Sequence, residues 1–237
     1  MGCNTSNSVH VAETSASLEE VKAENRPVSS KNNQPLYKLT YFDITGRAEL
    51  IRMIFAVGNL NFEDHRIKTE QWPELKKQMP LGQVPVLEIA ESPILVQTLA
   101  IARYVAKDVG IAGRNSLEMA KVDAVLDTAK ELFDEFVKKI VPETRNPTDQ
   151  REKVFQDFLE NIVPNSFKRI ETLITLYGSE DYCVGDQLTV ADLYIHDIVT
   201  NLIKLNPFVL ANYPLLKKNR TKVETNDNLK SYLQRRK

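Results

Sequence analysis

The sequence predicts an α/β domain followed by an all-helical domain, with a tail in front of them. Three observations support this prediction. Residues 1–34 contain no aromatic side chain and are rich in Ser, Asn and Glu, strand and helix patterns alternate over 35–112, and only helical patterns follow over 113–237. We therefore expect a disordered tail over 1–34, an α/β domain over 35–112 and a helical domain over 113–237.

The α/β domain is expected to contain four strands and two helices. Alternating and apolar patterns predict strands over 36–41, 62–67, 86–89 and 94–96. One helical pattern opens near Gly46 and ends at Gly58, and a second covers 98–109 and ends at Gly110. The order β-α-β, loop, β-β-α is typical of a small domain with a mixed four-stranded sheet.

The second half shows long helical patterns. They predict helices over 117–140, 149–176 and 190–205, and a last short helix near Leu229. Pro142 and Pro147 are expected to end the first helix and open the second, and Pro164 to kink or divide the second. Thr189 and Asp192 have the spacing of a capping box, which is a folding signal.

The composition excludes several classes of function. With 31 basic and 32 acidic residues the net charge is −1, so there is no electrostatic footprint for nucleic acid. The three histidines lack metal-ligand spacing, and we expect no metal site; Gly-rich phosphate loops and G-x-S-x-G are absent as well. Two cysteines, Cys3 and Cys183, do not form a disulfide framework and indicate a reducing compartment, so we expect a cytoplasmic protein.

The first six residues match a lipidation pattern. Gly2 and Ser6 stand where N-myristoylation requires Gly and Ser or Thr, and Cys3 is a candidate for palmitoylation. One myristoyl chain binds membranes only marginally, and a second chain makes attachment stable. Lipidation at Gly2 and Cys3 would hold the protein at the cytoplasmic face of a membrane; an accidental match in a flexible tail is the alternative.

Four clusters in the α/β half carry the candidate chemistry. Tyr41 and Arg47 flank the loop after the first strand, Trp72 and Lys76 follow the second strand, a Gly82-Gln83-Val84-Pro85 run precedes the third strand, and Gln97 and Thr98 stand at a helix N-terminus. Taken singly, each has a purely structural explanation, as a strand aromatic, a core plug, a helix cap or a solvated charge.

In this order and spacing the clusters resemble the glutathione transferases, specifically the sigma class that includes haematopoietic prostaglandin D synthase and the S-crystallins. The resemblance runs from about Leu36 to the C-terminus, and its most telling stretches are 37–42, 46–49, 63–67, 72–74, 82–88 and 99–104. It implies a thioredoxin-like first domain that binds glutathione as cosubstrate, a helical domain that meets a small hydrophobic electrophile, and a homodimer.

The resemblance also implies roles for single residues. Tyr41 falls on the catalytic tyrosine, whose hydroxyl would favour the glutathione thiolate, and Arg47 falls on the arginine that steadies it. The other glutathione contacts that it implies are Trp72, Lys76, Gly82, Gln83, Val84, the cis proline Pro85, Gln97, Thr98 and, from the partner subunit, Glu131. In the helical half, Phe136, Lys138 and Ile140 are candidates for contact with the electrophile.

Some positions depart from the family pattern. Thr98 replaces the usual serine, Glu131 the usual aspartate, and Lys130 one carboxylate of a family metal site. Lys138 stands where the prostaglandin-forming enzyme has a tryptophan. The expected function is a glutathione transferase acting on an electrophile, with a lipid-derived compound as one candidate. A glutathione-dependent prostaglandin D isomerase, or a non-catalytic crystallin-like or scaffold descendant, stays open as an alternative.

Overall fold

The computed structural model describes residues 36–90 and 92–236. The tail predicted over 1–34, with Gly2 and Cys3, lies outside these residues. In the described part of the chain, no helix combines the length and the apolar character that crossing a membrane requires.

The α/β domain contains one mixed sheet. Its strands are β1 (Tyr37–Phe42), β2 (Phe62–Ile67), β3 (Val86–Ile89) and β4 (Leu95–Val96), in the order β2-β1-β3-β4. β1 and β2 are parallel, whereas the pairs β1–β3 and β3–β4 are antiparallel. The predicted four-stranded mixed sheet is confirmed, although the fourth strand begins one residue later than predicted.

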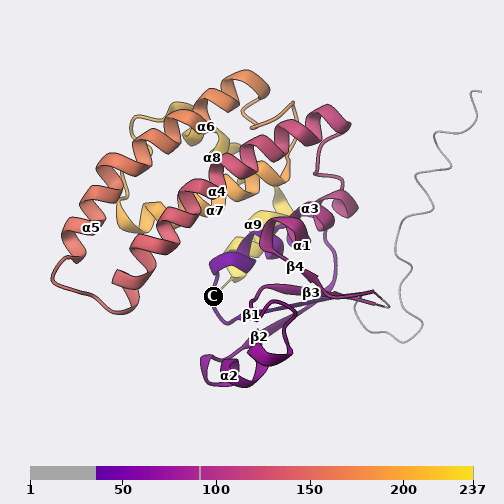
Figure 1. Cartoon of the computed structure of the whole chain (residues 1–237). Helices are drawn as coiled ribbons and strands as arrows, with labels where there is room; N and C mark the ends of the chain where they lie inside the picture. Colours follow the sequence, from indigo (N-terminus) through magenta and orange to yellow (C-terminus); the bar gives the residue numbers. More distant parts are fainter. Residues whose placement is uncertain (1–35, 91, 237) are drawn as a thin grey trace, which may run out of the picture.

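Two helices cover the side of the sheet that faces the helical domain. α1 (Glu49–Val57) follows a 3₁₀ turn, η2 (Gly46–Ala48), and α3 (Thr98–Val109) follows β4. Figure 1 shows α1 and α3 side by side between the sheet and the helices of the second domain. α3 ends at Gly110, which has a left-handed φ of 82° and accommodates it because it lacks a Cβ atom.

A short helical segment lies between β2 and β3, where the sequence predicts only a loop. It consists of η3 (Thr69–Gln71), α2 (Trp72–Leu75) and η4 (Lys76–Gln78). Each piece spans about one turn, which is too short to produce a recognisable hydrophobic period. Pro73 lies in the first turn of α2, where its missing N–H group costs no hydrogen bond.

The helical domain follows the prediction except at the end of its first helix and at α8 (Pro214–Val223). Its elements are α4 (Ser116–Arg145), α5 (Arg151–Asp157), the π-helical turn η5 (Phe158–Ile162), α6 (Val163–Tyr177), α7 (Val190–Leu205), α8 (Pro214–Val223) and α9 (Asp227–Arg235). The prediction that Pro142 ends the first helix is wrong. α4 continues past it to Arg145, because a proline in the last turn removes one hydrogen bond and the Asn146 N–H still donates to the Pro142 carbonyl at 2.8 Å.

One confirmation and the other difference concern the second half of this domain. The division of the predicted second helix at Pro164 is confirmed, since η5 interrupts the helix just before Pro164 and α6 begins with that proline in its first turn. α8 is not predicted by the sequence pattern. Only Leu216, Asn219 and Val223 are buried in this helix. The polar run Lys217-Lys218-Asn219-Arg220 interrupts any apolar period that could have indicated a helix.

The capping box of α7 is confirmed, and it also joins three segments. Asp192 is fully buried; its Oδ2 accepts from the main chain and the hydroxyl of Thr189 at 2.7 Å each. Its Oδ1 accepts from the main chain of Cys183 and the side chain of Asn219 in α8, also at 2.7 Å. Cys183 is buried, and burial raises the pKa of its thiol.

The two domains share one continuous apolar core. α7 packs against both α1 and the long helix α4, and side chains of both domains, such as Ile54 and Leu193, belong to the same buried cluster. This packing fixes the position of α4 relative to the loop that follows β1. The boundary predicted at residues 112 and 113 stays a prediction.

Candidate functional site

A cavity of about 480 Å³ lies where the end of β1, the start of α3 and the middle of α4 meet. It is lined by Phe42, Arg47, Trp72, Leu81, Gly82, Gln83, Val84, Pro85, Val96, Gln97, Thr98, Lys130 and Asp134. All the residues predicted to contact glutathione are among them except Tyr41, Lys76 and Glu131. The four clusters therefore come together around one cavity.

Tyr41 does not line the cavity, although its neighbours Phe42 and Arg47 do. Its side chain is 7% exposed, and its hydroxyl oxygen accepts a hydrogen bond from the main-chain N–H of Arg47 at 3.1 Å. A phenol can accept and donate at the same time, and in the described part of the chain no acceptor takes its proton. The hydroxyl is thus held in place and keeps its proton for a ligand.

The side chain of Arg47 crosses to the helical domain. Its Nη2 lies 3.2 Å from the Oδ1 of Asp134 in α4, and its Cζ lies 5.5 Å from the ring centroid of Phe133. The other carboxylate oxygen of Asp134 accepts from the ammonium of Lys130, one turn earlier in α4. The three side chains form one wall of the cavity.

The start of α3 forms another part of the cavity lining. Gln97 has φ 73° and ψ 120°, a left-handed conformation that costs a non-glycine residue free energy and is typically retained at functional sites. Thr98 is the first residue of α3, so its hydroxyl stands beside main-chain N–H groups at the positive end of the helix dipole. This arrangement suits a carboxylate.

The loop before β3 and the segment of α2 complete the cavity. The Val84–Pro85 peptide bond is cis, as the family resemblance implies. Trp72 packs edge-on against Phe42, with ring centroids 5.4 Å apart. Lys76 does not line the cavity, but its aliphatic chain lies against Gly82, where a Cβ atom would come within 3.5 Å of the Lys76 Cε.

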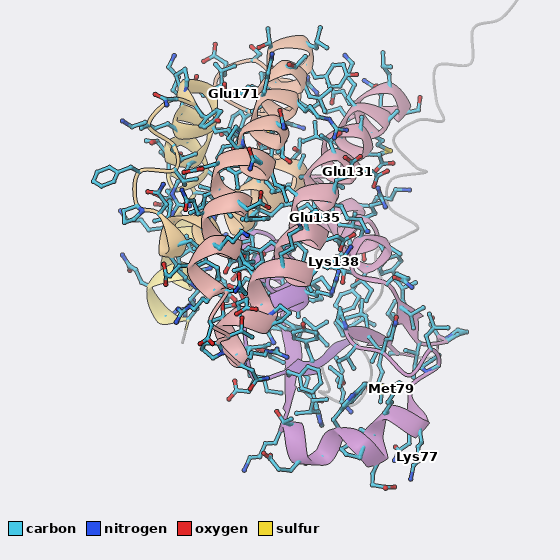
Figure 2. All side chains as sticks on the ribbon, turned by 60° about the vertical axis from the view of Figure 1, so that its left-hand side comes forward. Lys77, Met79, Glu131, Glu135, Lys138 and Glu171 are labelled. Carbon is cyan, nitrogen blue, oxygen red and sulfur yellow. The ribbon has the colours of Figure 1, made fainter. Side chains whose placement is uncertain are left out.

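Glu131 does not face the cavity of its own chain. Its carboxylate pairs with Arg169 of α6, with 2.5 Å between Oε2 and Nη1. Figure 2 shows Glu131, Glu135 and Lys138 along the same side of α4. An i, i+4, i+7 spacing produces such a stripe.

The residues of α4 that were expected to contact the electrophile do not line this cavity. Ile140 is completely buried in the core, so its assignment as an electrophile contact is wrong. Phe136 packs on Phe133 and Phe158, and Lys138 is exposed. The residues of α4 that do line the cavity are Lys130 and Asp134, which sequence reasoning did not assign to it.

Their i, i+4 spacing places Lys130 and Asp134 on one face of α4, but only the packing of α4 decides which face meets the cavity. Within residues 36–90 and 92–236, no group of three or more His, Cys, Asp or Glu side chains is arranged to hold a metal ion.

Two family models match the chain. The model described as "Glutathione S-transferase, N-terminal domain" matches residues 37–107, and that described as "Glutathione S-transferase, C-terminal domain" matches residues 130–236. Hematopoietic prostaglandin D synthase from Rattus norvegicus is 40% identical over 190 residues, which cover 80% of this chain and 91% of that protein. S-crystallin SL11 from Nototodarus sloanii is 33% identical over 202 residues, covering 85% of this chain and 97% of that protein.

Solved structures show the same likeness. Rat hPGDS complexed with a quinoline has a TM-score of 0.75 and 38% identity, covering 85% of this chain and 97% of that one. Monomeric Na-GST-3, a glutathione S-transferase from the hookworm Necator americanus, has a TM-score of 0.78 and 35% identity over the same shares. Together with the thioredoxin-like sheet and the helical second domain, these matches show that the chain belongs to the glutathione S-transferase family, in its sigma class, whose enzymes use glutathione as cosubstrate.

Proposed function

We propose that this protein binds glutathione in the 480 Å³ cavity and that the Tyr41 hydroxyl donates a hydrogen bond to the glutathione sulfur. An ordinary thiol has a pKa of about 8.5 and is mostly protonated at neutral pH. A donated hydrogen bond stabilises the thiolate; lowering the pKa by about two units corresponds to about 2.7 kcal/mol. The observation that carries the proposal is the Arg47 N–H bond, which fixes the Tyr41 oxygen and leaves its proton available.

The other residues of the site would each bind one part of the glutathione tripeptide. Gln97 and Thr98, at the N-terminus of α3, would bind the γ-glutamyl carboxylate. The main chain of Val84, with the loop residues Gly82, Gln83 and Pro85 around it, would pair with the cysteinyl residue as a sheet edge pairs with a short strand. Trp72, together with Lys76 next to the cavity lining, would bind the glycyl carboxylate.

The thiolate then attacks an electrophile that enters from the side of α4. The reaction forms a carbon–sulfur bond, the leaving group departs with the electron pair, and no covalent enzyme intermediate is needed. The α4 wall is polar, because the Arg47–Asp134–Lys130 chain forms it. A lipid-derived electrophile remains one candidate substrate.

Isomerisation to prostaglandin D is a second candidate. The rat protein of that name is 40% identical to this chain. A direct assay of product formation from a prostaglandin endoperoxide, in the presence of glutathione, distinguishes it from conjugation. Production of prostaglandin D would support it, and glutathione conjugation without any such product would exclude it.

We also propose that two copies form a homodimer and that Glu131 serves the partner's glutathione. The support is that Glu131 is exposed and directed away from the cavity of its own chain. Light scattering coupled to size exclusion measures the mass, and Glu131→Gln should raise the KM for glutathione in a dimer. A monomer of 27.0 kDa would refute this proposal.

Acylation of Gly2 and Cys3 is proposed from the sequence pattern. Fractionation of cells that express Gly2→Ala tests it: the protein should move from the membrane fraction to the soluble one. If Gly2→Ala leaves the membrane-bound fraction unchanged, the anchor is wrong. Cys3→Ser then tests whether a second acyl chain is needed.

The central experiment is steady-state conjugation of glutathione to a generic aryl halide. Tyr41→Phe should lose about 25-fold in rate at pH 7 if the pKa of the bound thiol returns from about 6.5 to about 8.5, because the thiolate fraction then falls from about three quarters to about 3%. Tyr37→Phe is the matched control, because Tyr37 lies in the same strand but its hydroxyl bonds Asp108 at 2.5 Å. A Tyr41→Phe rate equal to that of Tyr37→Phe and the wild type would refute the role of Tyr41. Absence of activity and of glutathione binding in the wild type would favour the non-catalytic descendant.

A further inference from the structure

Arg52 in α1 organises the loop between Tyr41 and Arg47. Its side chain is fully buried, and its Nε donates to Asp64 of β2 at 3.1 Å. The other guanidinium nitrogens donate to three main-chain carbonyls of that loop, those of Ile44 at 2.8 Å, Thr45 at 3.3 Å and Phe42 at 3.5 Å. Its Cζ also lies 6.0 Å from the ring centroid of Tyr41. One buried cation, Arg52, therefore holds the loop that positions the Arg47 N–H next to the Tyr41 hydroxyl.

Glu49 connects Arg52 to the C-terminal end of the chain. Its residue exposure is 1%, and its Oε2 lies 3.6 Å from the Nη1 of Arg52. Its Oε1 accepts from the hydroxyl of Tyr232 at 3.1 Å and from Nη1 of Arg236 at 2.9 Å. One carboxylate is thus shared between the cation that holds the loop and two side chains from the end of the chain.

These two side chains reach Glu49 because α9 lies against α1. Figure 1 shows α9 next to α1, although the sequence places it at the end of the helical domain. The side-chain amide of Asn228 in α9 donates to the carbonyl of Val57, the last residue of α1, at 3.2 Å. α9 therefore contacts α1 near both ends of α1, at Val57 through Asn228 and at Glu49 through Tyr232 and Arg236.

The shared carboxylate is sensitive to its partners because it is buried. An ionised group that loses a hydrogen-bonded partner in a low-dielectric interior interacts more strongly with the charges that remain. Without Tyr232 and Arg236, the remaining cation at Glu49 is Arg52. A closer Glu49–Arg52 contact competes with the bonds from Arg52 to the loop carbonyls.

We propose that Tyr232 and Arg236 are positioning residues for the Tyr41 site, acting through Glu49 and Arg52. This inference rests on the proposed function, because it assigns these residues a role in holding the thiolate-stabilising hydroxyl. Loss of the two contacts relaxes the loop over 42–45, and the Tyr41 oxygen loses the fixed position that the Arg47 N–H gives it.

The test compares Arg236→Gln and Tyr232→Phe, singly and combined, with Arg235→Gln in the full-length protein. Arg235 is the matched control, since it neighbours Arg236 but its Nε donates to the Ser231 carbonyl within α9. The readouts are the thiolate absorbance of bound glutathione against pH, the kcat and KM for aryl-halide conjugation, and the thermal midpoint of unfolding.

We expect the double variant to raise the apparent pKa of the bound thiol by about 0.5 to 1 unit, which from a starting pKa of about 6.5 is about a 1.5- to threefold loss of thiolate at pH 7. The KM for glutathione should stay unchanged, because the binding residues at the start of α3 and in α2 are untouched. Arg236→Lys, which keeps the charge, should recover part of the pKa effect. A double variant with a lower thermal midpoint but the thiol pKa of Arg235→Gln would show that α9 is only structural, and would overturn the proposal.

A double-mutant cycle separates this proposal from the proposed function. In a Tyr41→Phe background, Arg236→Gln should no longer change the thiol pKa, because its effect passes through Tyr41. An undiminished effect there overturns the proposal while leaving the role of Tyr41 intact. If bound glutathione has the same thiol pKa in Tyr41→Phe as in the wild type, Tyr41 does not stabilise the thiolate. That result refutes the proposed function itself.

Discussion

The hydroxyl of Tyr41 lies directly against the main chain of Gly46. A Cβ atom at position 46 would come within 2.7 Å of the Tyr41 oxygen and 3.0 Å of its Cε1. Gly46 also has a φ of +47°, a conformation that other residues rarely adopt. The absence of a side chain at this position lets the chain turn closely enough for the next residue, Arg47, to bond the hydroxyl.

Gly46→Ala is expected to displace the Tyr41 hydroxyl. The substitution should lower kcat for conjugation by about tenfold or more and cost about 1 to 3 kcal/mol of stability, since it adds both a steric conflict and backbone strain. Gly110→Ala is the control: its φ is +82°, but nothing lies within 4 Å of an added Cβ. It should lose stability while kcat stays at the wild-type value. A Gly46→Ala enzyme with wild-type kcat would contradict the role assigned to this contact.

Asp134→Asn removes the charge that holds the Arg47 side chain. Both side chains of the pair are more than a third exposed, at 36% and 39%, so the cost in stability should stay below about 1 kcal/mol. We expect kcat/KM for conjugation to fall about two- to tenfold at low salt and less at 1 M salt, where charges are screened. Asp127→Asn makes the same change in α4 at a residue that pairs with Arg103 instead. An equal effect of both variants would show that only the net charge matters.

Asp192→Ala should be among the most destabilising single changes in the helical domain. It leaves four donors without their Asp192 acceptor, two from Thr189 and one each from Cys183 and Asn219, and all four of these hydrogen bonds are buried. The expected loss is about 3 kcal/mol or more by chemical denaturation. Asn115→Ala, which removes an exposed cap with one bond to the Glu118 N–H, should cost about 1 kcal/mol. Similar losses of stability for Asp192→Ala and Asn115→Ala would contradict the prediction that the buried cap contributes more.

The buried carboxyl group of Asp197 should make the stability of the protein depend on pH. Burial, and secondly the charge of Glu49, raises the pKa of its carboxyl group to about 8. Between a pKa of about 4 in the unfolded chain and 8 in the folded one, the native state binds more protons, so this group makes stability fall as the pH rises through that range. Asp197→Asn should remove that fall, as urea unfolding at pH 5, 6.5 and 8 would show. The exposed Asp149→Asn should keep it, and an unchanged pH slope in Asp197→Asn would contradict the prediction.

Local patterns in the sequence predicted most of the elements. The helices α1 and α3 were recoverable because each buries a face of apolar residues at the helical period, and Gly58 and Gly110 mark their ends. The strands β1 to β3 were recoverable from short alternating or apolar runs between turn residues. The capping box of α7 was recoverable because both of its partners, Thr189 and Asp192, lie within one turn. The segment around Trp72 and the helix α8 were not, because one is too short and the other too polar to show a period.

The residues of the candidate site were found in part. Tyr41, Gln97 and Thr98 stand at positions that local spacing and the family resemblance identify, and the cavity brings their segments together. Lys130 and Asp134 were missed, because a charged pair on a long helix has the same local pattern whether it faces solvent or a cavity. Ile140 was misassigned because an apolar residue on a long helix has the same local pattern whether it lies in the core or borders a cavity.

The sequence by itself determined which chemical groups are present and which strands and helices carry them, since those properties depend on side-chain identity and on contacts within a few residues. Only the tertiary structure decided which face of α4 borders the cavity and that Arg236 reaches Glu49 across 187 positions of the chain. Such contacts arise when helices pack their buried faces together, and packing depends on the shape of the whole core, which no local pattern encodes.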